Sequence, residues 1–253
     1  MTDVTRAEYC AVAIADCFAD DGEIMGSPMG LLPTLGARLA KNTSNPLLLL
    51  TDGEARILRG TPPLGQTADV VEGWMPFRNV LEHVVPYGKR HVMMGATQID
   101  KHGNQNISAI GPWDQPTRQL LGVRGAPGNT VNNKTSYWVP KHSSRVVVEQ
   151  VDIVSGVGKA RAKEAGPAAT KFHNVPRLIT DLGVFDFEAP SATIRFVTIH
   201  PGVTVVPARQ ASGCDIHADG AVPFTREPTA GELVLIRELL DPKELREREV
   251  PAR

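Results

Sequence analysis

The chain has 253 residues, of which 42% are hydrophobic, and its 27 basic and 28 acidic residues nearly cancel. Such a balance argues against a nucleic-acid surface, which needs a basic face, and apolar runs broken well before ~18 residues argue against a membrane span. Three cysteines form neither an even disulfide set nor a CxxC pair, and acidic residues interrupt the first apolar stretch, so we expect one domain, residues 1–253, in the reducing cytoplasm.

The N-terminal part predicts one α/β unit. Apolar residues recur at three- and four-residue steps over residues 6–19, which predicts an amphipathic helix that Gly22 can end. A short strand at residues 23–25, a glycine loop at residues 26–30 and a helix at residues 31–41 follow. The glycine spacing fits neither the dinucleotide nor the P-loop fingerprint, so we expect this loop to be mainly structural.

Four consecutive leucines at residues 47–50 predict a buried parallel strand. This strand delivers Thr51, Asp52 and Glu54 to its carboxyl end, where open α/β sheets bind their ligands. These three residues are therefore candidate catalytic residues. A simple turn at Asp52, followed by a helix that starts at Glu54, is the alternative interpretation.

A Pro/Gly-rich loop over residues 59–73 precedes the aromatic cluster of residues 74–77. Long loops inside a domain are often functional, and a neighbouring aromatic cluster is typical of a subunit interface, although core packing explains the cluster equally well. A short helical segment is expected at residues 79–83. The sequence contains no HxH or HxxxH pair, so we expect no metal site.

The stretch from residue 92 to residue 129 carries the densest set of glycine and amide residues. An apolar strand end is followed by polar side chains, and three glycines then recur three residues apart. Glycine allows close approach of a ligand to the backbone, and successive N–H groups can form a nest for an oxyanion. A hairpin turn at residues 103–104 is the alternative. The candidate binding residues are Gly95, Gln98, Asn104, Gly122, Gly125, Gly128 and Asn129.

The C-terminal half predicts strands at residues 145–148 and 151–157, short antiparallel strands over residues 175–199, and an amphipathic helix after residue 229. The charged residues 243–253 are expected to be loose. Together these elements predict an α/β fold: an open, mostly parallel sheet with flanking helices, plus a smaller antiparallel β section.

Three segments carry a family resemblance. GATQIDKHGNQN with the following GxxGxxGN loop, EIMGSPMGLLPTLGARLAK near the start, and SGCD with LIRELLDP near the end resemble the β subunit of class I CoA transferases of the glutaconate type. The resemblance covers most of the chain. It implies a CoA-transferase (NagB-like) fold, an α subunit of the same fold in an α2β2 assembly, a site in the cleft between the subunits, and coenzyme A as part of the substrate with no bound cofactor.

At one position the sequence departs from this family. The nucleophilic glutamate of the family falls on Thr51, and a threonine hydroxyl cannot replace a carboxylate in CoA exchange. The chain therefore resembles the branch that opens the last steroid ring of a cyclic β-keto acyl-CoA by hydrolysis. We expect oxyanion donors in the loop of residues 122–129 and the main base on the partner. The alternatives are a CoA transferase that uses Asp52 or Glu54, and a non-catalytic partner subunit.

Overall fold

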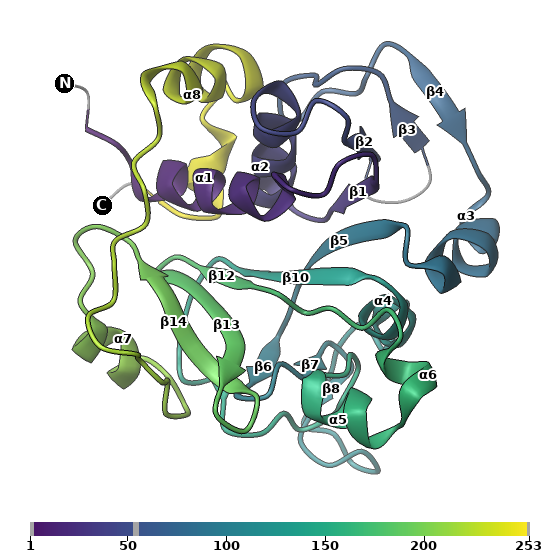
Figure 1. The fold of residues 1–253 in the computed structure, drawn as a ribbon, viewed down its shortest axis with the longest axis vertical. Coiled ribbons are helices and arrows are strands. Elements are labelled where there is room, and N and C mark those ends of the chain that lie inside the picture. Colours follow the sequence, from purple (N-terminus) through teal and green to yellow (C-terminus); the bar gives the residue numbers. More distant parts are fainter. Residues whose placement is uncertain (1–2, 53–55, 252–253) are drawn as a thin grey trace.

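A seven-stranded sheet organises the computed structural model, which describes residues 3–52 and 56–251 (Figure 1). The strands from β2 to β12 run parallel, and β12, β13 and β14 are antiparallel. The predicted α/β class and the mostly parallel sheet are thus confirmed. In spatial order the strands are β14 (Thr193–Ile199), β13 (Gly183–Ala189), β12 (Leu178–Thr180), β10 (Lys134–Val139), β5 (Arg90–Gly95), β1 (Met25–Pro28) and β2 (Leu49–Leu50).

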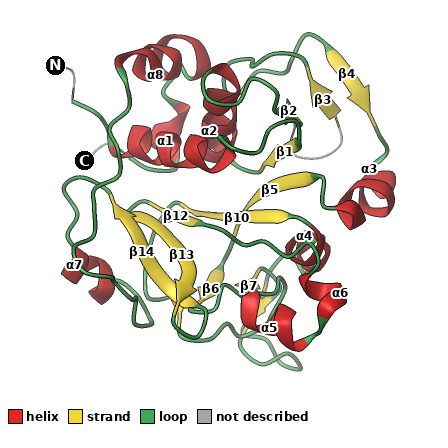
Figure 2. Ribbon diagram, viewed as in Figure 1, coloured by secondary structure: helices red, strands yellow, loops and turns green. Residues whose placement is uncertain are grey.

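Alternating side chains on the central strands separate two hydrophobic layers. Met93 and Trp138 face one layer, whereas their neighbours Val92 and Tyr137 face the other. Figures 1 and 2 show helices on both sides of the sheet. One layer holds α1 (Arg6–Phe18), α2 (Leu31–Asn42), α8 (Ala230–Val234) and the π-helical turn η3 (Leu235–Leu240); the other holds α4 (Ala126–Asn132) and α7 (Val205–Gln210).

Two strand boundaries in the N-terminal unit differ from the prediction. β1 spans Met25–Pro28 instead of residues 23–25, because it pairs in parallel with β2 on one side and with β5 on the other. β2 is only Leu49–Leu50, and Leu47 is 63% exposed. The predicted helices agree closely with α1 and α2, and Gly22 adopts the expected left-handed conformation with φ +65°.

Residues 98–106 form a hairpin, which confirms the alternative interpretation of that motif. β6 (Gln98–Asp100) pairs with β7 (Gln105–Asn106) around Gly103, whose φ is +79°. On its other side β6 pairs in parallel with β11 (Val147–Val148). The strand predicted at residues 151–157 is reduced to one antiparallel bridge between Gly156 and Gln105. Polar side chains hold the rest of the segment: Asp152 accepts from the Gly111 N–H, and Ser155 Oγ lies 2.7 Å from Ser108 Oγ.

The segment after β2 forms a hairpin that leads to exposed aromatic side chains. Trp74 is 67% exposed and Phe77 is 51% exposed, which favours an interface over core packing. Shorter elements complete this side of the molecule. They are β3 (Arg56–Leu58), β4 (Val71–Trp74), α3 (Phe77–Asn79), η1 (Val80–Val84), η2 (Val85–Tyr87), β8 (Ala109–Ile110), β9 (Arg118–Gln119), α5 (Lys159–Glu164) and α6 (Pro167–Thr170).

The C-terminal residues up to 251 are not loose, contrary to the prediction. The 3-10 turn η4 (Leu245–Arg248) buries Arg246, which is 2% exposed and pairs with the buried carboxylates of Glu8 and Asp241. Periodicity did not reveal the contact with Glu8, because that residue lies 238 positions away in sequence. The turn also directs Glu249 to the N-terminus of α2, where its carboxylate accepts from the N–H groups of Leu31 and Leu32.

Replacing Glu249 by glutamine is expected to lower the free energy of unfolding by about 1–3 kcal/mol, the range for charge-assisted hydrogen bonds. The carboxylate oxygens accept at 3.0 and 3.1 Å from α2 and at 2.9 Å from Trp138 Nε1, and a neutral amide offers only one acceptor oxygen. Urea unfolding measures the difference. Glu238→Gln, at an exposed position on η3, is the control; equal losses in the two variants would contradict this role.

Two buried histidines bind the carboxyl end of β12. His142 Nδ1 lies 3.1 Å from Thr180 Oγ1, and His200 Nε2 donates to the Thr180 carbonyl oxygen at 3.0 Å. Burial lowers the pKa of each imidazole from 6.5 to about 4. Both histidines therefore stay neutral in the folded chain at pH values where the unfolded chain already protonates them.

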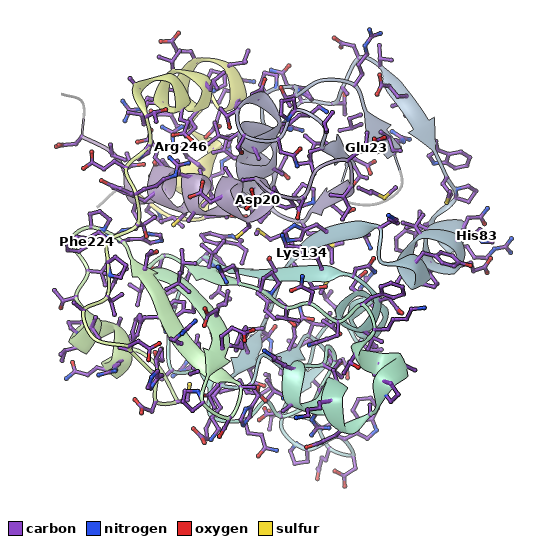
Figure 3. The ribbon with its side chains drawn as sticks, in the orientation of Figure 1. Asp20, Glu23, His83, Lys134, Phe224 and Arg246 are labelled. Atoms are coloured by element: carbon purple, nitrogen blue, oxygen red, sulfur yellow. The ribbon has the colours of Figure 1, made fainter. Side chains whose placement is uncertain are left out.

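We expect acid to destabilise the fold through these histidines. Since the unfolded chain binds more protons between pH 6.5 and about 4, the free energy of unfolding should fall with pH, by about 1.4 kcal/mol per pH unit for each histidine. Urea unfolding over this range measures the slope. His142→Gln should reduce the slope by the contribution of one histidine. His83→Gln, at the exposed position labelled in Figure 3, should leave the slope unchanged. Identical slopes in all three proteins would refute the linkage.

Candidate functional site

The carboxyl ends of β1, β2 and β5 lie at one edge of the sheet, since these strands are parallel and in register. Thr51 and Asp52 directly follow β2, and Gly95 ends β5. A cavity of about 220 Å³ opens beside Thr51 and Asp52, and Arg38, Arg56 and Gln66 also line it. The predicted catalytic candidate Glu54 lies outside the described residues, so its position is left open.

The Thr51 hydroxyl is buried, and its described neighbours are not bases. It lies 3.2 Å from the Gly26 carbonyl oxygen and 3.1 Å from Ser27 Oγ, and the residue is only 4% exposed. Neither neighbour can ionise a threonine hydroxyl. The exposed Asp52 carboxylate accepts from the Arg56 N–H at 3.3 Å, which is a turn contact.

A chain of buried hydrogen bonds connects Thr51 to the glycine loop. From Thr51 it continues to Ser27 Oγ, which accepts from Arg90 Nε at 2.8 Å, and Arg90 Nη1 donates to Asn129 Oδ1 at 2.9 Å. We call these four residues the buried polar chain. The strand end and the glycine loop, predicted separately, are thus physically joined through Arg90. Our sequence reasoning missed Arg90, although a basic residue that opens the otherwise buried strand RHVMMG is a visible signal.

The loop of residues 122–129 combines a tight turn with close packing. Gly122 has φ +82° and Arg124 φ +46°, and Gly125 follows at φ −86°, ψ 2°. A left-handed residue followed by a right-handed one is the geometry of an anion-binding nest. The Ala126 N–H donates to the Val123 carbonyl, so it is engaged within the loop. At Gly128 a Cβ would lie 3.2 Å from Val85 Cγ1, which accounts for that glycine by packing.

The amide side chains of the central hairpin form hydrogen bonds within the chain. Asn104 Nδ2 donates to the Asp100 carboxylate at 3.0 Å, and Asn104 Oδ1 accepts from the Gly158 N–H at 2.8 Å. Gln98 Oε1 accepts from Asn106 Nδ2 at 2.7 Å. These bonds hold the hairpin in shape, and a role in substrate binding stays a prediction for Gln98 and Asn104.

A Ser–His–Asp arrangement also exists, but it is internal. His91 Nε2 lies 2.9 Å from Ser136 Oγ, and His91 Nδ1 lies 2.6 Å from the Asp21 carboxylate. Burial lowers the pKa of His91, which Asp21 opposes without reversing. Ser136 and His91 are fully buried, so a substrate has no access to this hydroxyl. The arrangement therefore stabilises β5 and β10 rather than performing nucleophilic catalysis.

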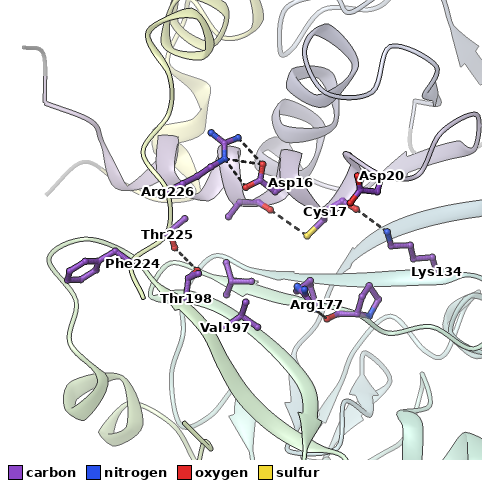
Figure 4. Close-up of a pocket in the computed structure, with 13 residues that line it drawn as sticks. Asp16, Cys17, Asp20, Lys134, Arg177, Val197, Thr198, Phe224, Thr225 and Arg226 are labelled. Carbon is purple, nitrogen blue, oxygen red and sulfur yellow. Dashed lines mark hydrogen bonds and ion pairs between the residues drawn. The ribbon is translucent and has the colours of Figure 1, made fainter. Parts of the chain in front are cut away.

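A larger cavity, of about 440 Å³, lies near the amino ends of β10 and β12 (Figure 4). Charged side chains of both signs line it, including Lys134, and Arg226 pairs with Asp16 at 2.8 Å. Its place at the amino ends separates it from Thr51 and Asp52. Within residues 3–52 and 56–251, no cluster of histidine, cysteine and carboxylate side chains is suited to a metal ion. Over the same residues, no helix has the length and apolar character to cross a membrane.

Comparison with known proteins identifies relatives over nearly the full length. The cholesterol ring-cleaving hydrolase IpdB subunit of Rhodococcus jostii is 56% identical over 250 residues, which are 99% of this chain and 98% of the relative. The subunit of the same name from Mycobacterium tuberculosis is 54% identical over 248 residues, covering 97% and 98% of the two chains. No family model matches the chain.

Solved structures also match over nearly the full length of the chain. A chain in the crystal structure of Rhodococcus jostii IpdAB matches with a TM-score of 0.92 at 56% identity, covering 98% of this chain and 99% of the other. Glutaconate coenzyme A-transferase from Acidaminococcus fermentans matches with a TM-score of 0.83 at 20% identity, covering 96% and 97%. The second match shows the fold alone, and it confirms the predicted CoA-transferase architecture.

Proposed function

Because the chain belongs to the family of the cholesterol ring-cleaving hydrolase IpdB subunit, we propose that it works with a partner subunit to open the ring of a cyclic β-keto acyl-CoA by hydrolysis. The observation that carries the proposal is the buried Thr51 hydroxyl at the end of β2, with a carbonyl and a hydroxyl beside it. A threonine hydroxyl cannot form the covalent glutamyl thioester of a CoA transferase, so this position favours direct attack by water.

The reaction needs a base, an oxyanion site and a grip on the acyl-CoA. Water adds to the ring ketone, and the bond from that carbon to the carbon beside the thioester breaks. The electron pair forms a thioester enolate, which then takes up a proton, and the former ketone carbon becomes a carboxylate. The donors for the oxyanion come from the loop of residues 122–129, and the main base comes from the partner subunit.

A partner subunit also accounts for the exposed apolar surface. Trp74, Phe77 and Tyr87 are more than half exposed, as are Trp113 and Leu121. Large exposed aromatic side chains are typical of protein interfaces. The IpdAB structure contains a relative of this chain in a complex. We infer an α2β2 assembly in the cytoplasm, in which these side chains contact the α subunit and coenzyme A enters as part of the substrate.

Two experiments on the chain co-expressed with its α-like partner test the function. The complex is incubated with a cyclic oxo-acyl-CoA from sterol ring degradation, and separately with an acyl-CoA donor and a free carboxylic acid. Ring opening without CoA exchange is the expected result. CoA transfer to the free acid, with an enzyme thioester trapped by hydroxylamine, would instead favour a transferase that uses Asp52 or Glu54. If no substitution at Thr51, Asp52, Gly125 or Asn129 slowed turnover of the complex, the chain would be a non-catalytic subunit.

A further inference from the structure

Arg90 is a buried cation with an unusual set of partners. It is the first residue of β5 and is 2% exposed. Its guanidinium donates to two neutral oxygens, Ser27 Oγ and Asn129 Oδ1. Within the described residues no carboxylate lies at ion-pair distance, and burial lowers the Arg90 pKa to about 10. A buried charge without a counter-ion is costly, which points to a role beyond stability.

The Arg90 bond decides the orientation of the Asn129 amide. Arginine carries donors only, so the group that faces it at 2.9 Å must be the carbonyl oxygen of Asn129. The amide nitrogen then faces Met94 Sδ at 3.4 Å. A thioether is a weak acceptor, so the NH2 group of Asn129 is left available to a better one. A cation bound to the amide oxygen also polarises the group and strengthens its N–H as a donor.

Gly125 borders this amide nitrogen, on a residue that is 4% exposed in the isolated subunit. A Cβ added at Gly125 would lie 3.5 Å from Asn129 Nδ2 and 3.8 Å from Leu81 Cδ2, which are ordinary contact distances. The backbone at Gly125, with φ −86° and ψ 2°, imposes no need for glycine. The absent side chain therefore leaves no Cβ between the amide and the loop predicted to hold the oxyanion.

We propose that Arg90 is a positioning residue that turns the Asn129 amide so that Nδ2–H donates to the oxyanion formed during ring opening. This inference rests on the proposed function and adds a side-chain donor to the backbone donors of the loop. The interaction strengthens only as negative charge develops on the substrate, so its loss lowers kcat and kcat/KM together.

Asn129→Asp separates this role from a structural one. The carboxylate supplies a counter-ion that Arg90 has from none of the described residues, so the melting temperature of the complex should rise by a few degrees. The same change removes the N–H donor and places a negative charge at the oxyanion site, so turnover should fall by about 100- to 1000-fold. A merely structural link would give the higher melting temperature with turnover intact.

Asn132→Asp is the matched control, because Asn132 lies on the same helix and bonds the Gly128 carbonyl oxygen instead of Arg90. It should keep turnover. Arg90→Lys retains the charge but lacks the planar fork whose Nε and Nη1 bond Ser27 and Asn129 in fixed directions, so it should lower kcat at least about tenfold with little change in KM.

The outcomes distinguish the inference from the function on which it rests. If the wild-type complex does not open a cyclic β-keto acyl-CoA, the proposed function fails and the inference with it. If the wild type is active, full turnover in Asn129→Asp or a lowered melting temperature in that variant overturns the role of Arg90 alone.

Discussion

Gly125→Val is expected to slow ring opening by the assembled enzyme by about 100- to 1000-fold, the loss typical of an oxyanion donor. Valine fits the backbone at this position, where φ is −86°, and its Cβ would meet Asn129 Nδ2 at 3.5 Å without a clash. Its two methyl groups would extend into the space beside the amide and exclude the substrate oxygen. Steady-state kinetics of the complex and its melting temperature measure the two effects.

The controls separate blockage from misfolding. Gly125→Ala adds only the Cβ and should give an intermediate rate. Gly231→Val lies on α8, where an added Cβ meets no atom within 4 Å, and should leave the rate unchanged. If Gly125→Val retains full activity, the loop is not the oxyanion site. If Gly125→Val is inactive while Asn129→Asp is active, backbone N–H groups alone provide the donors.

Local patterns predicted those parts of the fold that depend on local physics. The helices α1 and α2 follow from apolar periodicity, and α1 begins with a Thr5–Glu8 capping box. The buried strand before Gly95 follows from its apolar run. The left-handed Gly103 and Gly122 follow from the missing Cβ.

Local patterns did not predict features that depend on residues distant in sequence. The start of β1 depends on pairing with β2 and β5, and no local signal encodes that register. The predicted smaller antiparallel section is present, but its attachment could not be predicted: β12 pairs in parallel with β10, so the antiparallel strands β13 and β14 continue the main sheet. The predicted single domain fits this continuous sheet and stays a prediction.

In the candidate site, too, some parts could be predicted from local sequence and one could not. The strand end at Thr51 and the loop that ends at Asn129 were recognisable from composition and from family resemblance. The residue that joins them, Arg90, is adjacent to neither in sequence. Its side chain reaches both because β5 pairs with β1 and Asn129 on α4 lies within hydrogen-bond distance. A basic residue in an apolar strand is therefore worth examining as a site residue before it is assigned to the surface.

Arg246→Ala is expected to lower the free energy of unfolding by about 3–5 kcal/mol, the usual cost of breaking a buried ion pair. Figure 3 places Arg246 beside α1 and α8. Its guanidinium lies 3.3 Å from Glu8 and 3.1 Å from Asp241, and both carboxylate side chains are fully buried. Their removal from water is compensated by Arg246, and alanine would leave two buried negative charges with less compensation. Urea unfolding at pH 7 measures the loss.

Arg237→Ala is the matched control, because Arg237 also pairs with Glu8, at 2.6 Å, but its side chain is 27% exposed. This variant keeps Arg246 between the buried carboxylates of Glu8 and Asp241, so it should lose less stability than Arg246→Ala. The Arg246→Ala deficit should shrink as the pH falls, since the uncompensated carboxylates can then take up protons in the folded chain. A pH-independent deficit would mean that lost packing, not charge, destabilises the variant. In both cases η4 would loosen, because Arg246 is its buried residue, and Glu249 would be held less firmly at the N-terminus of α2.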